Sequence, residues 1–323
     1  MKNFIKALQF TAGACAMALA ALAPGLHAQE RFPNQPIRLV VPYPAGGTTD
    51  LIARQFGEQL GRELGQTVLI ENRPGGGTNI GAEFVARSRP DGHTLLFGNS
   101  TQVLNPIFGP KPSFDLSALE PISLVSRVAF VIGANPKVPF STGPEMLAAA
   151  KAAPGKISVS SAQLDLYVEL LNIKAGISLL HVPYKGGAPA TTDAVSGQVN
   201  MVYALVPVLL PHIQGGKLKA MAVTTGTRLS TLPDVPTLTE LGVDYDVGIW
   251  YGLLAAAGTP KAIVDRLSSL TQKIMGSPEM VQKIRASGAE AASNKPEDFQ
   301  AMLKSETIFW QQVAKSLPHL VQK

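Results

Sequence analysis

Cysteine is almost missing from the sequence, since Cys15 is the single one among 323 residues. It lies in an apolar stretch near the amino terminus, and cleavage behind that stretch leaves a mature chain without a thiol. Such a chain has no disulfide, no cysteine metal site and no thiol nucleophile, so after export its core alone must stabilise it. Lipidation of Cys15 would need a bulky aliphatic residue three positions earlier, where Ala12 stands.

Charge is also scarce, at 16% of the residues, and no basic run occurs. Two of the 28 lysines and arginines lie near the amino terminus, which leaves 26 basic against 23 acidic residues in the mature chain. Because basic and aromatic residues do not interleave, nucleic acid is not indicated as a partner. The net charge of +3 is a mild bias that fits small anionic ligands or no particular partner.

Metal and nucleotide motifs are missing as well. The five histidines show no His-x-x-x-His spacing, so no metal is expected. The glycine-rich turn at 75–81 lacks the Lys-Ser/Thr ending of a Walker loop, and Ile80 breaks the GxGxxG spacing. The sequence therefore predicts no cofactor.

The first 28 residues have the pattern of a secretory signal peptide. Lys2 and Lys6 precede an apolar run over 7–23, and cleavage is expected after Ala28. A membrane anchor is the alternative, but the run is rich in weakly apolar residues and ends at Pro-Gly. No other stretch reaches the length of a membrane span, and the signal predicts that the mature chain is exported.

Short strand-like runs alternate with helix-like stretches along the mature chain. Strands are expected over Ile37–Val41, 67–70 and 94–97, with helices between them, and the carboxyl-terminal part is mainly helical. Two further strands are expected within 122–132. This βαβ pattern predicts an α/β fold with a largely parallel sheet.

The stretch 41–50, Val-Pro-Tyr-Pro-Ala-Gly-Gly-Thr-Thr-Asp, joins an expected strand to an expected helix. Two glycines permit a tight, exposed turn, and Thr48, Thr49 and Asp50 are residue types that cap helix starts. Free N–H groups and the helix dipole at such a start favour an anion. An ordinary βα turn is the alternative, and Asp50 is expected to be structural.

The segment 182–193 repeats this pattern. It also begins Val-Pro-Tyr, continues through two glycines and reaches Thr-Thr-Asp, which is expected to precede a helix. The repeat predicts two helix starts that face each other across a ligand cleft.

Five motifs follow one another along nearly the whole mature chain: Tyr43-Pro-Ala-Gly-Gly-Thr-Thr-Asp50, Asn72-Arg-Pro-Gly75, His181-Val-Pro-Tyr-Lys-Gly186, Leu232-Pro-Asp-Val-Pro-Thr237 and Gly258-Thr-Pro260. With them the sequence resembles the periplasmic solute receptors of tripartite tricarboxylate transporters, the Bug receptors. The resemblance implies a two-lobed, type II-like periplasmic-binding-protein fold, each lobe a sheet flanked by helices, joined by crossover strands. Lobe 1 is expected over 29–128 plus 250–323, and lobe 2 over 129–249.

The same resemblance implies a receptor and not an enzyme. Its ligand would be a small carboxylate (a dicarboxylate, an aromatic carboxylate or an amino acid), delivered by a monomeric receptor to membrane permease subunits. The loop at 43–50 would hold one carboxylate, and lobe 2 would contribute its own loops. The expected ligand contacts are Tyr43, Ala45, Gly46, Gly47, Thr48, Thr49, Asn79, Thr101, Ser160, Ser161, Tyr184 and Ala188.

One segment departs from the family pattern. After Ser160 and Ser161, relatives commonly carry a glycine- and serine-rich turn with a histidine, whereas this chain has Ala-Gln-Leu-Asp-Leu-Tyr over 162–167. Such a bulky segment cannot offer the same bare N–H groups, and Asp165 would repel an anion unless it is neutralised or turned away. We therefore expect altered contacts to the far end of the ligand.

Two alternatives stay open at this point. An exported hydrolase or isomerase would use Ser160 or Ser161 as nucleophile and His181 as base, although Gly-x-Ser-x-Gly is absent. A receptor could also serve a sensor kinase, with its closed form docking on the kinase ectodomain.

Overall fold

The computed structural model describes residues 32–109, 111–162 and 164–321. The chain divides into two units, 1–34 and 35–323, and the second contains every named strand and helix. The predicted signal peptide, 1–28, lies outside the described residues.

The second unit is built on a ten-stranded sheet with the order β2-β1-β3-β9-β4-β7-β5-β6, to which β8 and β10 add by pairing with β4. Three strands before β4 are mutually parallel around β1, and β5 pairs in parallel with β6 and β7. This arrangement confirms the predicted α/β class, but the sheet is mixed and not largely parallel, because β4 and β9 pair in antiparallel fashion with their neighbours. The strands are β1 (Ile37–Val41), β2 (Val68–Asn72), β3 (Thr94–Asn99), β4 (Leu119–Ala134), β5 (Ser158–Ala162), β6 (Leu180–Tyr184), β7 (Met201–Leu205), β8 (Lys219–Val223), β9 (Gly248–Ala256) and β10 (Glu290–Ala291).

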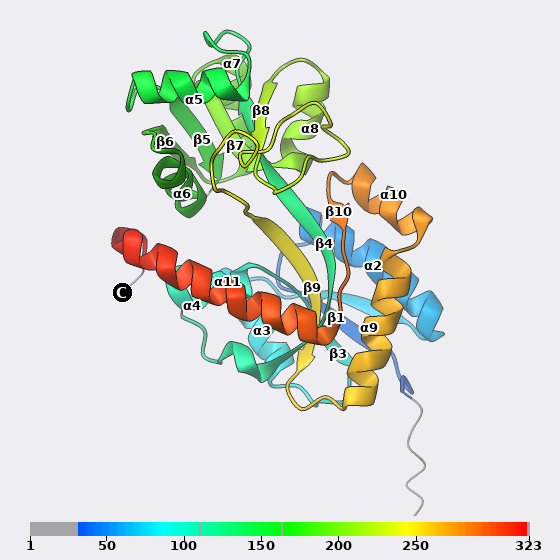
Figure 1. Cartoon of the computed structure of the whole chain (residues 1–323). Helices are drawn as coiled ribbons and strands as arrows, with labels where there is room; N and C mark the ends of the chain where they lie inside the picture. Colours follow the sequence, from blue (N-terminus) through cyan, green and yellow to red (C-terminus); the bar gives the residue numbers. More distant parts are fainter. Residues whose placement is uncertain (1–31, 110, 163, 322–323) are drawn as a thin grey trace, which may run out of the picture. The chain divides into compact units, whose positions relative to one another are not determined.

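Two long antiparallel strands connect the parts of the sheet (Figure 1). The first part of β4 pairs with β9, and its last five residues pair with β7. We call the strands β1, β2 and β3 with their helices the β1–β3 half, and β5, β6, β7 and β8 with theirs the β5–β8 half. The two strands expected within 122–132 are in fact this one strand, because its register shifts at two bulges without a turn.

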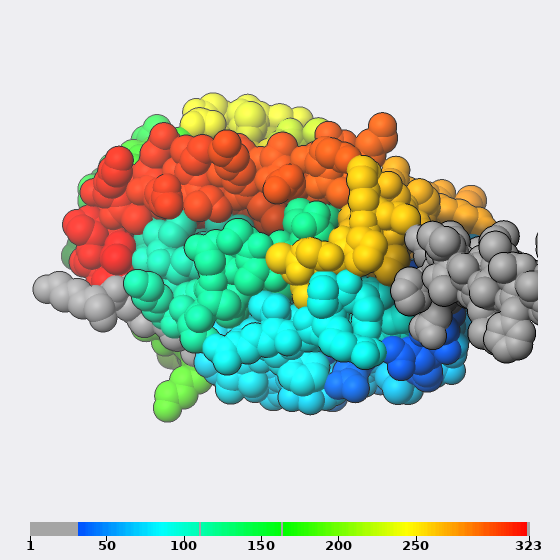
Figure 2. Space-filling view, turned by 90° about the horizontal axis from the view of Figure 1, so that it is seen from below, coloured from blue at the N-terminus to red at the C-terminus, as the bar shows by residue number. Residues whose placement is uncertain are grey.

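Ten helices are described in the second unit, and each covers part of the sheet. The longest, α11, packs against β4 and α4, and Figure 2 shows it lying along the segment that contains α4. None of the described helices is long and apolar enough to cross a membrane. They are α2 (Thr48–Leu64), α3 (Asn79–Ala86), α4 (Thr101–Phe108), α5 (Gly143–Ala152), α6 (Asp165–Ala175), α7 (Gly187–Ser196), α8 (Val206–Gln214), α9 (Lys261–Met275), α10 (Pro278–Ala286) and α11 (Pro296–Ser316).

Helix α2 shows how the sequence pattern fixes these elements. Its apolar residues recur every three or four positions, and Ile52, Phe56 and Leu60 are fully buried. The helix ends at Gly65, whose left-handed φ of 66° lets its N–H bond back to the carbonyl of Arg62. Burial of this face fixes the helix against the sheet and so places its amino terminus at the carboxyl end of β1.

Candidate functional site

The β1–α2 junction presents backbone N–H groups at a helix start. The first hydrogen bond of α2 runs from the Leu51 amide to the Gly47 carbonyl at 3.0 Å. The amides of residues 48–50 therefore precede the helical ladder. Ala45, Gly46 and Gly47 are exposed, and a Cβ on either glycine would meet no atom within 4 Å. This open helix start is suited to an anion.

Asp50 holds that junction in shape. Its carboxylate accepts hydrogen bonds from Arg54 Nε (2.8 Å), Asn72 Nδ2 (2.9 Å) and the Gly46 amide (3.0 Å). These bonds, that of Arg54 above all, lower the pKa of Asp50 from 3.8 to about 2. The side chain is 5% exposed, so Asp50 is a structural anchor whose charge Arg54 neutralises.

A polar network joins the ends of β1 and β3. The Tyr43 hydroxyl accepts from Asn99 Nδ2 at 2.7 Å, and Asn99 Oδ1 accepts from the Thr101 hydroxyl at 2.6 Å. The Thr101 hydroxyl also lies 2.9 Å from that of Thr78. Burial raises the pKa of Tyr43. The structure thus brings Tyr43 and Thr101 together through Asn99, which the sequence reasoning missed although it ends a parallel strand beside β1.

Thr49 and Asn79, two further expected ligand contacts, form hydrogen bonds within the protein through their side chains. The Thr49 hydroxyl is buried and donates to the Tyr251 hydroxyl on β9 at 3.3 Å, while Thr48 is half-buried. Asn79 begins α3, and its Oδ1 accepts from Asn105 Nδ2 at 3.0 Å. Thr49 therefore offers a ligand its backbone amide and not its hydroxyl.

The β5–α6 junction contains a chain of three side chains. The Ser161 hydroxyl lies 2.7 Å from His181 Nε2, and His181 Nδ1 lies 3.1 Å from Asp165 Oδ1. Ser160 points to the other face of the sheet, where its hydroxyl donates to the Ala190 carbonyl at 2.9 Å. Both serines are fully buried. A role for them in ligand binding stays a prediction.

The β6–α7 junction corrects the expected repeat. Helix α7 begins at Gly187, so Thr191 and Asp193 lie in its second turn and not before it. Pro189 fits the first turn of a helix, where its missing N–H is not needed. The Tyr184 hydroxyl donates to Asp193, which raises the pKa of Tyr184. Ala188 is exposed near the start of α7.

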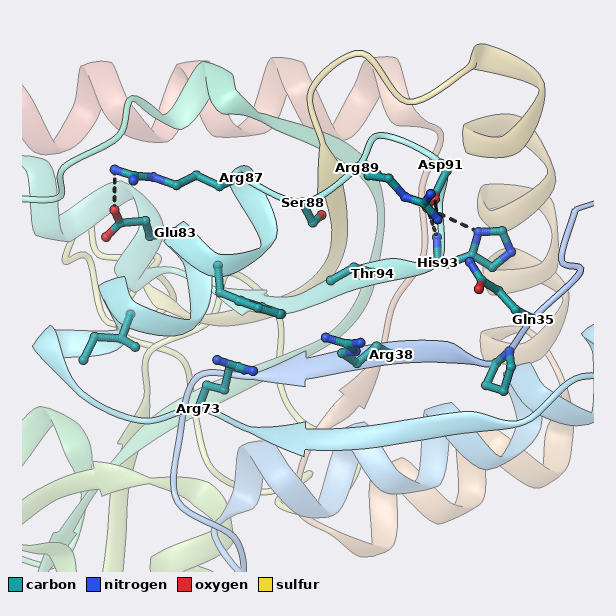
Figure 3. A pocket seen from close by; sticks show the side chains of 13 residues that line it. Gln35, Arg38, Arg73, Glu83, Arg87, Ser88, Arg89, Asp91, His93 and Thr94 are labelled. Atoms are coloured by element: carbon teal, nitrogen blue, oxygen red, sulfur yellow. Dashed lines mark hydrogen bonds and ion pairs between the residues drawn. The ribbon is translucent and has the colours of Figure 1, made fainter.

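A separate hollow of about 670 Å³ extends from the amino-terminal ends of β1 and β3 along α3 to Arg73, just after β2 (Figure 3). Four arginines line it, and each pairs with a carboxylate: Arg38 and Arg73 with Glu71, Arg87 with Glu83, and Arg89 with Asp91. Its lining contains none of the expected ligand contacts. We place the candidate site at the carboxyl ends instead, because helix starts and polar side chains converge there.

Among the described residues, no group of three His, Cys, Asp or Glu side chains is arranged to hold a metal ion. The candidate site consists of amides, hydroxyls and internally paired carboxylates. The amides and hydroxyls can bind and orient an anion.

Comparison with known proteins identifies the family. A family described as the tripartite tricarboxylate transporter family receptor, TctC, matches residues 52–318. BugT of Bordetella pertussis is 32% identical over 294 residues, covering 88% of this chain and 90% of BugT.

Solved structures agree with this match. The R. palustris protein Rpa4515, solved with adipate, is 30% identical with a TM-score of 0.76, covering 88% of this chain and 97% of its own. MatC from Rhodopseudomonas palustris, solved with bound malate, is 28% identical with a TM-score of 0.71, covering 87% and 99%. These likenesses confirm the predicted periplasmic-binding-protein fold. The chain therefore belongs to the receptor family of the tripartite tricarboxylate transporters, whose members include the Bug proteins.

Proposed function

We propose that this chain is a periplasmic receptor that binds a small carboxylate between lobe 1 (29–128 plus 250–323) and lobe 2 (129–249). The receptor then delivers the ligand to the permease subunits of a tripartite tricarboxylate transporter. It acts as a monomer after cleavage of a signal peptide near Ala28. The long strands β4 and β9 connect the lobes and serve as the hinge for closure.

The open start of α2 carries this proposal. An anion at a helix start gains about 0.3–1 kcal/mol when exposed and up to about 2 kcal/mol when partly buried. Each charge-assisted hydrogen bond adds roughly 1.5–3 kcal/mol. A few such bonds reach the roughly 8 kcal/mol that micromolar binding requires. The relatives solved with adipate and malate support a carboxylate as the ligand class.

Isothermal titration and thermal denaturation of the mature chain test the proposal. The panel contains adipate, malate, terephthalate and an acidic amino acid, each with product analysis after prolonged incubation. We expect at least one carboxylate to bind and raise the Tm without being converted. If no carboxylate binds, the anion site is wrong, and if a bound carboxylate is turned over, the receptor function is wrong.

The chain Ser161–His181–Asp165 supports a second candidate, an exported hydrolase. Its order of nucleophile, base and orienting carboxylate is that of a catalytic triad. However, Ser161 is fully buried, so a substrate could reach its hydroxyl only after rearrangement. The product analysis above separates the two functions. A receptor that serves a sensor kinase would bind the same ligands, and deletion of the permease genes would leave its response intact.

A further inference from the structure

Asp165 places a carboxylate at the first position of α6, beside the carboxyl end of β5. His181 holds one of its oxygens at 3.1 Å, yet 48% of the Asp165 side chain remains exposed. A carboxylate at the first turn is stabilised by the helix dipole. The start of α6 therefore already carries a negative charge, that of the Asp165 carboxylate, and this carboxylate is accessible.

The charge of this junction is never positive. If His181 is neutral, the Ser161 hydroxyl donates to Nε2 and the Nδ1–H group donates to the Asp165 carboxylate. The three side chains together then carry a charge of −1. If His181 is an imidazolium, it donates to both neighbours and the total is zero. In both states an incoming second carboxylate meets no compensating charge from these side chains.

Tyr167, two residues beyond Asp165, brings this junction close to the β1–β3 half. Its ring packs edge-on against Trp310 of α11, with the ring centroids 5.6 Å apart. Trp310 also packs edge-on against Phe108 of α4, the helix that follows β3 and begins at Thr101, with the ring centroids 6.2 Å apart. The β5–α6 junction is thus close to the helix that follows β3, and the proposed cleft would hold the starts of α2 and α6 in one ligand space.

The charged side chains near that space include three carboxylates that accept hydrogen bonds within the protein. Glu306 of α11, beside Trp310, accepts from Trp250 Nε1 at 2.6 Å. Asp50 is neutralised by Arg54, and Asp193 accepts from the Tyr184 hydroxyl. Lys185 is exposed on the loop after β6 and is a cation that could pair with a second carboxylate of the ligand. The experiment below therefore includes it.

Building on the proposed function, we infer that the ligand carries one carboxylate, bound at the start of α2, and an uncharged or cationic group at its far end, which faces Asp165. Like-charge repulsion from Asp165 selects against a carboxylate at both ends. Asp165 is thus a specificity-determining residue.

Calorimetric titration of the mature chain with a matched six-carbon series tests this inference. The six-carbon series consists of adipate, its monoamide and 6-aminohexanoate. A four-carbon series repeats the comparison with succinate, its monoamide and 4-aminobutanoate. We expect the monoamide or the amino acid to bind at least tenfold tighter than the dicarboxylate of the same length. Asp165→Asn, which keeps the shape and loses the charge, should reduce this preference at least tenfold.

Asp244→Asn is the matched control, because Asp244 is 94% exposed and pairs with Lys174 at the far end of α6. It should leave the ranking unchanged, and circular dichroism should show Asp165→Asn folded. A wild-type preference for the dicarboxylate, or an unchanged ranking in Asp165→Asn, overturns the inference while the receptor function stands. A selective tenfold loss of adipate binding in Lys185→Gln also overturns it. If only the dicarboxylates malate or terephthalate of the panel above bind, the inference is overturned while the receptor function stands. Absence of binding by these six compounds and by the whole panel overturns the proposed carboxylate site itself.

Discussion

The β1–α2 and β5–α6 junctions occupy equivalent places in their βα units, and each contains an aspartate in the first turn of its helix. At the β1–α2 junction, Asp50 is the third residue of α2 and is 5% exposed, because Arg54, Asn72 and Gly46 all bond to it. At the β5–α6 junction, Asp165 is the first residue of α6 and is 48% exposed. One aspartate supports the helix start at which we propose that the ligand binds, and the other lies at the helix start itself.

The partner of each aspartate explains this difference. Arg54 stands one turn along the same helix and neutralises the Asp50 carboxylate, which also holds the Gly46 amide, so the turn is fixed without a net negative charge. His181 lies on the neighbouring strand β6 and holds Asp165 at the helix start. The same residue type therefore has opposite effects on anion binding at the two junctions.

The largest effect is expected when the β1–α2 junction is made to resemble the β5–α6 junction. Gly47→Asp places a carboxylate at the N-cap of α2, where no atom blocks a Cβ and φ is an ordinary −84°. The new side chain should bond to the free amides and weaken carboxylate binding at least 100-fold. Stability should stay equal or rise by a few tenths of a kcal/mol.

Titration calorimetry and urea unfolding measure both effects. Gly47→Ala is the control, since it adds a Cβ without an acceptor and should weaken binding much less. Equal losses in the two variants would mean that crowding, and not occupation of the amides, causes the effect.

Next in size is the loss of the Asp50 anchor. The pKa of Asp50 lies at about 2 in the folded chain and at 3.8 ordinarily. A carboxyl group whose pKa is lower in the folded chain stabilises the fold at pH values above its ordinary pKa. This stabilisation is lost as the pH falls through the pKa of the folded chain. Asp50→Asn should therefore lower the free energy of unfolding by about 2 kcal/mol at pH 7.

The difference between Asp50→Asn and wild type should shrink as the pH falls from about 4 towards about 2. Urea unfolding at a series of pH values gives this difference directly. A destabilisation that does not change over that range would show that lost packing, and not the Arg54 ion pair, is its source.

A smaller effect is expected from Ser161→Ala at the β5–α6 junction. The variant leaves buried His181 Nε2 without its 2.7 Å partner, which should cost about 1–3 kcal/mol if water cannot enter and near 1 kcal/mol if it can. Ser160→Ala removes a bond on the opposite face and should destabilise similarly. A change in preference only for Ser161→Ala would sharpen the role of the His181–Asp165 pair.

The smallest effect is expected for Tyr184→Phe. It removes the hydrogen bond to Asp193 at a half-buried position, so the stability loss should be about 0.5–1 kcal/mol. If Tyr184 contacts the ligand, binding should weaken only a few fold, and calorimetry decides this. A loss as large as that of Gly47→Asp would move the main carboxylate site to the β5–β8 half.

Much of the fold followed from the sequence, because apolar periodicity and glycine turns are local signals. The strand Ile37–Val41 and helix α2 illustrate this, although α2 begins at Thr48 with Gly47 as its N-cap, so Thr48, Thr49 and Asp50 lie in the first turn and do not cap it. The internal repeat led to a wrong prediction, that of a helix that begins after Asp193. The placement of the glycines and Pro189 allowed α7 to begin four residues before Thr191. Resemblance in residue order does not fix the position of a helix start.

The candidate site was less predictable than the fold. Its Tyr43–Asn99–Thr101 network depends on the pairing of β1 and β3 across the sheet, which sequence spacing does not reveal. The pairing of Asp165 with His181 likewise depends on the register of β5 and β6. The sequence could mark Asp165 as unusual, but only the tertiary structure shows the partner that holds it.

Amide chemical shifts most directly test the claim that the start of α2 binds the ligand carboxylate. The ¹⁵N–¹H spectrum of the mature chain should be recorded during titration with the tightest-binding carboxylate. We predict the largest saturable shifts at the amides of Gly47, Thr48 and Thr49, with downfield proton shifts that indicate new hydrogen bonds. Saturable binding that leaves these three amides unmoved would contradict the account.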